Sequence, residues 1–395
     1  MTIPLQLPPP AQRPKRPFFS SGPCVKRPGW TPHVLAHALL GRSHRSHEGR
    51  EVLRRAIRET HDLLGLPENY RVAIVPGSDT GAFEAAMWSL LGARGVDVLA
   101  WEVFGKVWVG DIVRELKLAD VRVLEAPFGE LPDMSKVDFA RDVVFTWNGT
   151  TSGVRVPNGD WIPEDRAGLT LIDATSAIFA QRIDWHKADV ITYSWQKVLG
   201  GEAAHGMLIL SPRAIERLES YVPPWPIPKL FRLTKEGRLD TAIFAGETIN
   251  TPSMLCVADY LDALSWARSI GGLEELIARA DRNAAIVDSW IERTPWVAHM
   301  ARDPATRSNT SVCLRIVDER VATSSTEAQG QFVREMVSML ETAGVAFDIA
   351  AHRNAPPGLR IWTGATVEAQ DVEVLLPWLD WAFRSLAASK LAPAH

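Results

Sequence analysis

Short apolar runs alternate with amphipathic stretches through the first two thirds of the chain. The runs have the length of buried strands and are separated by turn residues. They predict strands at 72–76, 96–101, 121–125, 143–146, 169–172, 190–193 and 207–210. Helices are predicted between them, among others at 48–64 and 82–91. This alternation indicates a layered α/β unit built on a largely parallel sheet.

The last third of the chain has a different pattern. Gly271 and Gly272 interrupt a long helical stretch that begins with a helix predicted at 253–267. Beyond them the pattern predicts an α+β unit, with strands at 310–317 and 358–363 and helices at 326–343 and 367–388. We therefore expect three parts: an N-terminal arm at 1–17, a large domain at 18–268 and a small C-terminal domain at 269–395.

The N-terminal arm and the first part of the large domain each show a pattern of their own. Residues 1–17 contain six prolines and several basic residues, which is typical of an extended arm without a core of its own. A helix is predicted to begin near Thr31-Pro32, with the threonine as its cap and the proline in its first turn.

Composition narrows the classes of function. Of the 395 residues, 46% are hydrophobic and 23% are charged, as in an ordinary soluble protein. A net charge of -4 gives no reason to expect nucleic acid or an anionic membrane as a partner. No apolar run approaches the length of a membrane span, and the N-terminus lacks a signal-peptide core. Three cysteines far apart in sequence predict reduced thiols in a cytoplasm.

Two single polar residues end apolar runs in the large domain. Lys197 follows the run at 190–193, and a lysine is costly to desolvate there. Its amine has a chemical use if it forms a Schiff base with an aldehyde cofactor. Asp173 ends another run 24 residues upstream, and pyridoxal phosphate needs an acid that keeps its pyridine nitrogen protonated. The pair therefore favours pyridoxal-phosphate chemistry, whereas a lone lysine would be a solvated surface residue.

A glycine-flanked turn, Gly77-Ser-Asp-Thr-Gly81, leads from a predicted strand into a helix. Such a turn presents free backbone N–H groups and the positive end of a helix dipole, which suit a phosphate. A simple helix capped by Ser78 or Asp79 is the alternative. Asp79 would repel a phosphate unless its side chain turned back to cap the helix. We therefore expect phosphate binding from Thr80 and backbone groups.

Several motifs together resemble a known family. Asp173-Ala-Thr-Ser and Ser194-Trp-Gln-Lys197 resemble the fold-type I pyridoxal-phosphate enzymes. With Ser20-Ser-Gly-Pro23, Ser43-His-Arg45 and Asn250-Thr-Pro252, the sequence resembles the class V phosphoserine aminotransferases, from about residue 20 to about residue 365. The resemblance implies an α/β fold-type I transferase. Its large domain has a mostly parallel mixed sheet, and its smaller C-terminal domain is α+β.

The resemblance also implies roles for single residues. Lys197 and Asp173 would be catalytic. Contacts with pyridoxal 5'-phosphate are implied for Asp79, Thr80, Trp108, Thr150, Asp173, Gln196, Lys197, Asn250 and Thr251. Substrate contacts are implied for His44, Arg45, His352, Arg353 and Arg360, and no metal is implied. From spacing alone, Trp108 could equally be a core residue, Asn250 and Thr251 a helix cap, and the His-Arg pairs solvated loops.

The function implied is amino transfer between glutamate and 3-phosphohydroxypyruvate in serine biosynthesis. Pyridoxine biosynthesis and a homodimer with shared active sites are also implied. Two alternatives stay open. One is another class V enzyme, such as a serine- or alanine-glyoxylate aminotransferase. A cysteine desulfurase is disfavoured because Cys313 lies inside a predicted strand, where a buried thiol is inert. The other alternative is a non-catalytic binding protein, against which the Asp173 and Lys197 pair argues.

Overall fold

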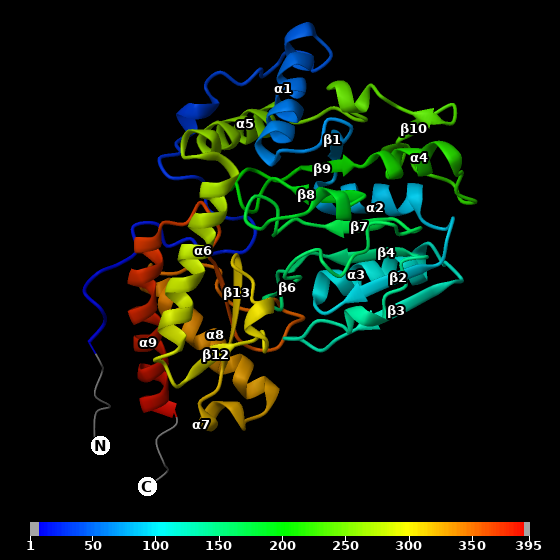
Figure 1. The fold of residues 1–395 in the computed structure, drawn as a ribbon. Coiled ribbons are helices and arrows are strands. Elements are labelled where there is room, and N and C mark those ends of the chain that lie inside the picture. The colour runs from blue at the N-terminus through cyan, green and yellow to red at the C-terminus, as the bar shows by residue number, and fades with distance from the viewer. Residues whose placement is uncertain (1–7, 391–395) are drawn as a thin grey trace.

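The computed structural model describes residues 8–390, and a seven-stranded sheet forms its centre. The strand order is β1-β9-β8-β7-β4-β2-β3. Strands from β8 to β3 run parallel, whereas β9 runs antiparallel to both β1 and β8 (Figure 1). The strands are β1 (Arg71–Pro76), β2 (Val96–Ala100), β3 (Val121–Glu125), β4 (Asp142–Thr146), β7 (Thr170–Asp173), β8 (Val190–Ser194) and β9 (His205–Leu210). The predicted α/β class with a mostly parallel mixed sheet is confirmed.

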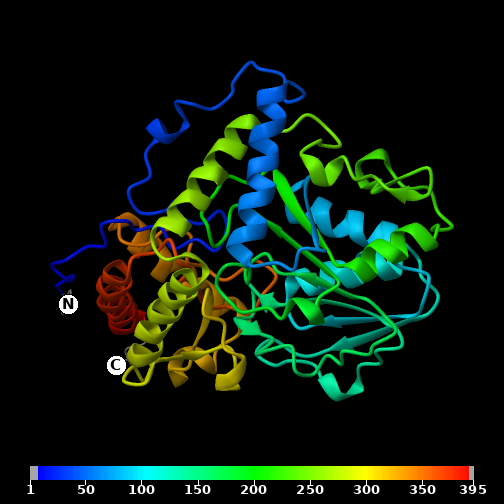
Figure 2. The ribbon, with the colours of Figure 1, turned by 45° about the horizontal axis from the view of Figure 1, so that its top comes forward.

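Helices cover both faces of this sheet because its strands are apolar on both sides. Along β1, Val72 and Ile74 join one hydrophobic core, while Ala73 and Val75 join the other. The first core lies under α1 and α5, which run side by side in Figure 2, and the second lies under α2, α3 and α4. The helices are α1 (His47–Leu64), α2 (Ser78–Leu90), α3 (Val103–Gly110), α4 (Pro212–Ser220) and α5 (Met254–Ser269). Burial on both faces explains why these strands read as continuous apolar runs.

A second, antiparallel sheet forms the centre of the C-terminal part. It has the order β12-β13-β14, with helices α6 and α9 packed side by side next to it (Figure 1). Its elements are α6 (Gly272–Ile291), β12 (Val297–His299), β13 (Ser311–Ile316), α7 (Glu319–Ala322), α8 (Thr326–Thr342), β14 (Leu359–Trp362) and α9 (Ala369–Lys390). The chain turns from α5 into α6 at Gly271 and Gly272, which both have positive φ angles. The domain boundary near residue 268 stays a prediction.

The N-terminal segment runs along the C-terminal part. The carbonyl of Gln12 accepts a hydrogen bond from Trp378 Nε1 at 2.7 Å, and the backbone N–H of Lys15 donates to Asp371 at 2.7 Å. Residues 1–7 of the predicted arm and 391–395 of the predicted small domain lie outside the described residues. The described part of the arm is therefore attached to helix α9.

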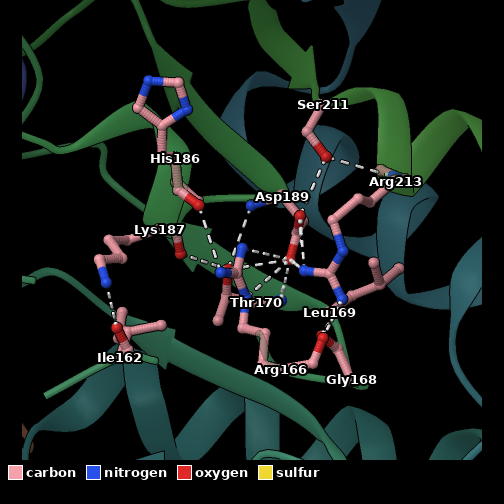
Figure 3. Close-up of polar contacts among 12 residues, drawn as sticks. Ile162, Arg166, Gly168, Leu169, Thr170, His186, Lys187, Asp189, Ser211 and Arg213 are labelled. Carbon is pink, nitrogen blue, oxygen red and sulfur yellow. Dashed lines mark hydrogen bonds and ion pairs between the residues drawn. The ribbon is translucent and has the colours of Figure 1, made fainter. Parts of the chain in front are cut away.

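Three buried aspartates mark the edge of the sheet at which the parallel strands begin. Asp97 lies in β2, Asp142 begins β4, and Asp189 directly precedes β8. Asp189 pairs with Arg166 and Arg213 at 2.9 Å each, and it also accepts hydrogen bonds from Thr170 and Ser211 (Figure 3). Asp97 pairs with Arg141 at 2.9 Å, and Asp142 with Arg217 at 2.8 Å. Each of these carboxylates therefore has a cation that offsets its loss of solvation.

Short elements fill the connections. They are η1 (Pro32–Leu35), η2 (Asp111–Glu115), η3 (Met134–Lys136), β5 (Asn148–Gly149), β6 (Val154–Arg155), η4 (Trp185–Lys187), η5 (Lys229–Phe231), β10 (Thr234–Lys235), β11 (Arg238–Leu239), η6 (Ile243–Ala245) and η7 (Pro304–Thr306). The helix predicted near Thr31-Pro32 is only the 3-10 helix η1. Pro32 is in its first turn as expected, but Thr31 makes no side-chain cap.

Candidate active site

A cavity of about 120 Å³ lies where strands β4, β7 and β8 end. In parallel sheets ligands bind at this carboxyl edge. Seven of the sequence-predicted cofactor residues line it: Asp79, Thr80, Trp108, Thr150, Asp173, Gln196 and Lys197. Ser78, Phe104, Thr146, Asn148, Thr175, Ser176 and Ser194 complete the wall.

Lys197 reaches the cavity from the turn after β8. Its ammonium nitrogen, Nζ, donates a hydrogen bond to the carbonyl of Ser21. Gly22 lies so close, with a φ of 151°, that a Cβ atom there would collide with Nζ. Burial lowers the pKa of Lys197, the Arg360 charge lowers it further, and Cys24, Asp173 and Glu102 oppose the shift. The shift is in the direction of the neutral amine, which is the nucleophilic form.

Asp173 is the last residue of β7, and two donors hold its carboxylate. Trp108 Nε1 donates to Oδ2 at 3.1 Å, and the backbone N–H of Thr175 donates to Oδ1 at 3.0 Å. Trp108 is itself fixed against Phe83, with ring centroids 4.8 Å apart. The acid is thus held in one orientation inside the cavity.

The turn before α2 forms another side of the cavity. Gly77, in the left-handed conformation, is the N-cap residue and makes no side-chain cap. The N–H groups of Gly77 and Ser78 donate to the Ala204 carbonyl at 3.2 and 3.3 Å. The amides of Asp79 and Thr80 have no partner among the described residues. A helix N-terminus with free amides is suited to an anion.

The alternative of a simple helix with a side-chain cap is wrong for this turn. Neither Ser78 nor Asp79 caps the helix, because the cap position is Gly77. The side chain of Asp79 instead points into the protein, where it is 7% exposed and lines the cavity. Its carboxyl is a neighbour of Asp173.

Hydrogen bonds among Thr150, Ser176 and Asn148 hold another wall of the cavity. Thr150 Oγ1 donates to Ser176 Oγ at 2.8 Å, and Ser176 Oγ donates to the Asn148 carbonyl at 2.9 Å. Other buried polar atoms of the wall have no partner in the described chain: Asp79 Oδ1, Thr146 Oγ1, Thr175 Oγ1, Ser194 Oγ and Gln196 Oε1. Unpaired buried polar atoms are unfavourable unless a ligand satisfies them. Together with an amine, an acid and free amides, they fit pyridoxal phosphate.

Arg360 and His352 approach the cavity from the C-terminal part. Arg360 lies in β14, half-buried, and its charge lowers the pKa of Lys197. The His352 ring lies 6.0 Å from that of Phe104, which lines the cavity. Burial lowers the pKa of His352, and the charges of Arg360 and Arg353 lower it further. Arg360 therefore lies near Lys197, and His352 lies near the wall of the cavity.

The other sequence-predicted residues do not line the cavity. Arg45, Asn250, Thr251 and Arg353 are exposed. His44 is 8% exposed, its Nε2 has no partner in the described chain, and burial together with the Arg45 charge lowers its pKa. The helix after Asn250 and Thr251 is capped by Ser253, whose hydroxyl accepts from Cys256 N at 3.3 Å.

Sequence reasoning assigned no role to several residues of the site. Ser21 and Gly22 contact the lysine amine although they lie about 176 residues away in the chain. Asn148 lies two residues past the end of β4, and Thr175 and Ser176 lie two and three residues past the end of β7. Because they are polar residues at the carboxyl edge, their position was the available signal.

Metal and thiol chemistry find little support here. Within residues 8–390, no group of three or more histidine, cysteine or acidic residues is placed to hold a metal ion. Cys313 is buried in β13, as predicted, and burial raises the pKa of its thiol to about 12. Burial does the same to Cys24. Such thiols are poor nucleophiles.

Comparison with known proteins identifies close relatives. The chain is 56% identical to the phosphoserine aminotransferase of Methanosarcina mazei over 374 residues, which are 95% of this chain and 98% of the relative. The solved structure of a phosphoserine aminotransferase from Cytophaga hutchinsonii matches with a TM-score of 0.77, at 22% identity, over 92% of this chain and 97% of that one. The PLP-bound enzyme of Trichomonas vaginalis matches with a TM-score of 0.75, at 20% identity, over 93% and 100%. No family model matches the chain.

Proposed function

The chain belongs to the phosphoserine aminotransferase family, and from that premise we propose that it transfers an amino group between glutamate and 3-phosphohydroxypyruvate. The products are 2-oxoglutarate and phosphoserine, in serine biosynthesis. The cofactor is pyridoxal 5'-phosphate. When bound, this group supplies an aldehyde for amino groups and a ring that accepts electron density.

One observation carries this proposal: Lys197 and Asp173 line the same cavity from the ends of adjacent strands. An amine with a lowered pKa attacks an aldehyde and moves a proton at its Nζ atom. A carboxylate held by Trp108 and Thr175 binds a protonated ring nitrogen. A protein that only bound ligands would have no use for a buried lysine in this position.

The substrate's carboxylate is assigned to Arg360. Its guanidinium acts on the pKa of both Lys197 and His352, and its Nε has no partner among the described residues. An arginine binds a carboxylate through two parallel hydrogen bonds. Arg360 is therefore placed to hold an α-carboxylate near the lysine.

The phosphate of the substrate is assigned to the two His-Arg pairs, His44-Arg45 and His352-Arg353. His352 lies near the cavity, whereas Arg45 and Arg353 are exposed and His44 does not line it. Among the described residues, no hydrogen bond or ion pair joins the two pairs. We propose a homodimer in which a second copy supplies the missing pair, and in which Asn250 and Thr251, both exposed, reach the partner's cofactor phosphate.

The cysteines bear on the cellular setting. All three cysteines are free. No helix of the described residues is both long and apolar enough to cross a membrane. We assign the enzyme to the cytoplasm because free thiols suit a reducing compartment. A role in pyridoxine biosynthesis requires 4-phosphohydroxythreonine as a second substrate.

The test is a transamination assay with matched acceptors. Purified protein is loaded with PLP and given glutamate with 3-phosphohydroxypyruvate, hydroxypyruvate or glyoxylate, while 4-phosphohydroxythreonine is tested in the reverse direction. The first two acceptors differ only in the phosphate. We expect kcat/KM to be roughly ten- to a hundredfold higher for the phosphorylated one. Equal values, or a preference for glyoxylate, would refute the assignment and favour a glyoxylate-using aminotransferase.

A further inference from the structure

The cavity contains a second buried acid besides Asp173. Asp79 lies in the first turn of α2, is 7% exposed and lines the cavity next to Asp173. No described lysine, arginine or histidine forms an ion pair with either carboxyl. Ionising both of two neighbouring carboxyls that lack an ion-pair partner is unfavourable, because each charge raises the energy of the other.

The hydrogen bonds decide which acid carries the charge. Asp173 accepts from Trp108 Nε1 at 3.1 Å and from the Thr175 amide at 3.0 Å. Asp79 Oδ1 has no partner in the described chain. Donors favour the ionised form of a carboxyl, so the described hydrogen bonds favour Asp79 as the protonated member of the pair.

The electrostatics agree with this division. Burial raises the pKa of Asp79 well above its ordinary value and the Asp173 charge raises it further, while the hydroxyls of Thr192 and Thr175 oppose the shift. Two other titratable groups on neighbouring elements interact electrostatically with Asp173. Lys197, after β8, has a lowered pKa, and Glu102, before α3, has a pKa raised to about 7 by burial.

We propose that Asp79 is a positioning residue, which stays protonated in the folded enzyme and donates a hydrogen bond to Asp173. As a neutral group it leaves the N-terminus of α2, where the amides of Asp79 and Thr80 are free, attractive to a phosphate. An aspartate in a phosphate turn is then no contradiction, because it adds no negative charge. This inference rests on the proposed function for its ligand, PLP.

Infrared spectroscopy tests the protonation directly on the full chain. The difference spectrum between the parent and Asp79→Asn, recorded at about pH 7 with and without PLP, is expected to show the C=O band of a protonated carboxyl in the parent. Bands of an ionised carboxylate in its place would overturn the proposal. The matched control is Glu84→Gln, since Glu84 is on the same helix and burial also raises its pKa, but it does not line the cavity.

Cofactor binding tests the consequence. PLP dissociation constants are measured by Trp fluorescence for the cofactor-free parent, Asp79→Asn and Asp79→Ala. Asparagine mimics the neutral acid and keeps a donor, so we expect a Kd within about threefold of the parent near neutral pH. The alanine variant is expected to bind roughly tenfold more weakly, because Asp173 loses its donor. As pH rises, the parent is expected to weaken relative to Asp79→Asn.

Two outcomes overturn the proposal. Tenfold tighter binding by Asp79→Asn near neutral pH would show that Asp79 is normally charged. Equal binding by the asparagine and alanine variants would show that its hydrogen bond has no role. Pyridoxal, which lacks the phosphate, separates the two effects, because only the hydrogen bond acts on it. The infrared result stands even if the substrate proves to be another keto acid, so failure of the proposed function is distinguishable.

Discussion

Buried acids have different partners at the beginnings and at the ends of the parallel strands in the central sheet. Where the parallel strands begin, Asp97, Asp142 and Asp189 are each paired with arginine. Where they end, Asp173 and the nearby Asp79 have no described cation partner. A carboxylate that is paired with an arginine is held in place and is not available to a ligand. A carboxyl without such a partner can still form a hydrogen bond or an ion pair with a ligand.

Strand β2 shows the contrast within a few residues. Asp97, at its start, is fully buried and lies 2.9 Å from Arg141. Glu102, just past its end, is also fully buried, but it accepts hydrogen bonds only from the backbone and from Thr151, and its pKa is raised to about 7. Two equally buried acids thus have an arginine partner at one edge and neutral hydrogen-bond donors at the other. The difference lies in which edge receives arginines.

Removing the lysine should have the largest effect. Lys197→Ala is expected to lower transamination by at least about a thousandfold, because one amine both binds the cofactor and moves the proton. The variant should remain folded, since no buried ion pair is broken. Turnover and circular dichroism are measured together. Turnover close to that of the parent in a folded variant would contradict the chemical role of Lys197.

Exchanging one aspartate at each edge separates structure from chemistry. Asp189→Asn leaves Arg166, whose side chain is 1% exposed, with less charge compensation, so the free energy of unfolding should fall by about 3–5 kcal/mol. Asp173→Asn should change stability little, yet lower turnover roughly a hundredfold or more, since an amide cannot hold the ring nitrogen's proton by charge. Chemical denaturation and kcat are measured for both. A large loss of stability in Asp173→Asn, together with a large loss of turnover in a stable Asp189→Asn, would contradict this account.

Glu102 predicts a pH dependence of stability. Its pKa rises on folding from 4.5 to about 7, so the folded chain binds the proton more tightly than the unfolded chain in that interval. Its contribution is fully present below about pH 4.5 and is lost as pH rises through about 7, a change of roughly 3 kcal/mol. Denaturant titrations of the cofactor-free parent and Glu102→Gln compare the two slopes. An identical decline in both would show that Glu102 is not responsible.

The arginines of the substrate side should have the smallest individual effects. Arg45→Ala and Arg353→Ala are expected to lower kcat/KM for 3-phosphohydroxypyruvate by roughly ten- to a hundredfold, with little effect on hydroxypyruvate. Arg360→Ala should lower both alike, because both substrates carry the α-carboxylate. If Arg45 and Arg353 affected both substrates equally, the phosphate assignment would fail.

The sequence predicted the polar residues at the carboxyl ends of the strands better than those at the amino ends. Lys197 and Asp173 stand out because each is a single polar residue at the end of an apolar run, and the strand bounds followed from the same runs within about two residues. Asp189 also borders such a run, but nothing local indicates its partners Arg166 and Arg213. Pairing of that kind depends on how connections fold back over the edge.

Long-range contacts account for what the sequence missed. Ser21 and Gly22 meet Lys197 across about 176 residues. The burial of Asp79 depends on the direction of α2 relative to β7, which no periodicity encodes. A local pattern predicts elements and their ends, whereas the environment of a side chain depends on how the elements pack.

The most direct test of the central claim is to locate the cofactor's attachment. PLP-loaded protein is reduced with borohydride, digested and sequenced by mass spectrometry, with Lys197→Ala as the matched control. The account predicts a pyridoxyl label on Lys197 in the parent and none in the variant. A label on another lysine, or equal labelling of both proteins, would show that the carboxyl-edge cavity is not the site of the chemistry.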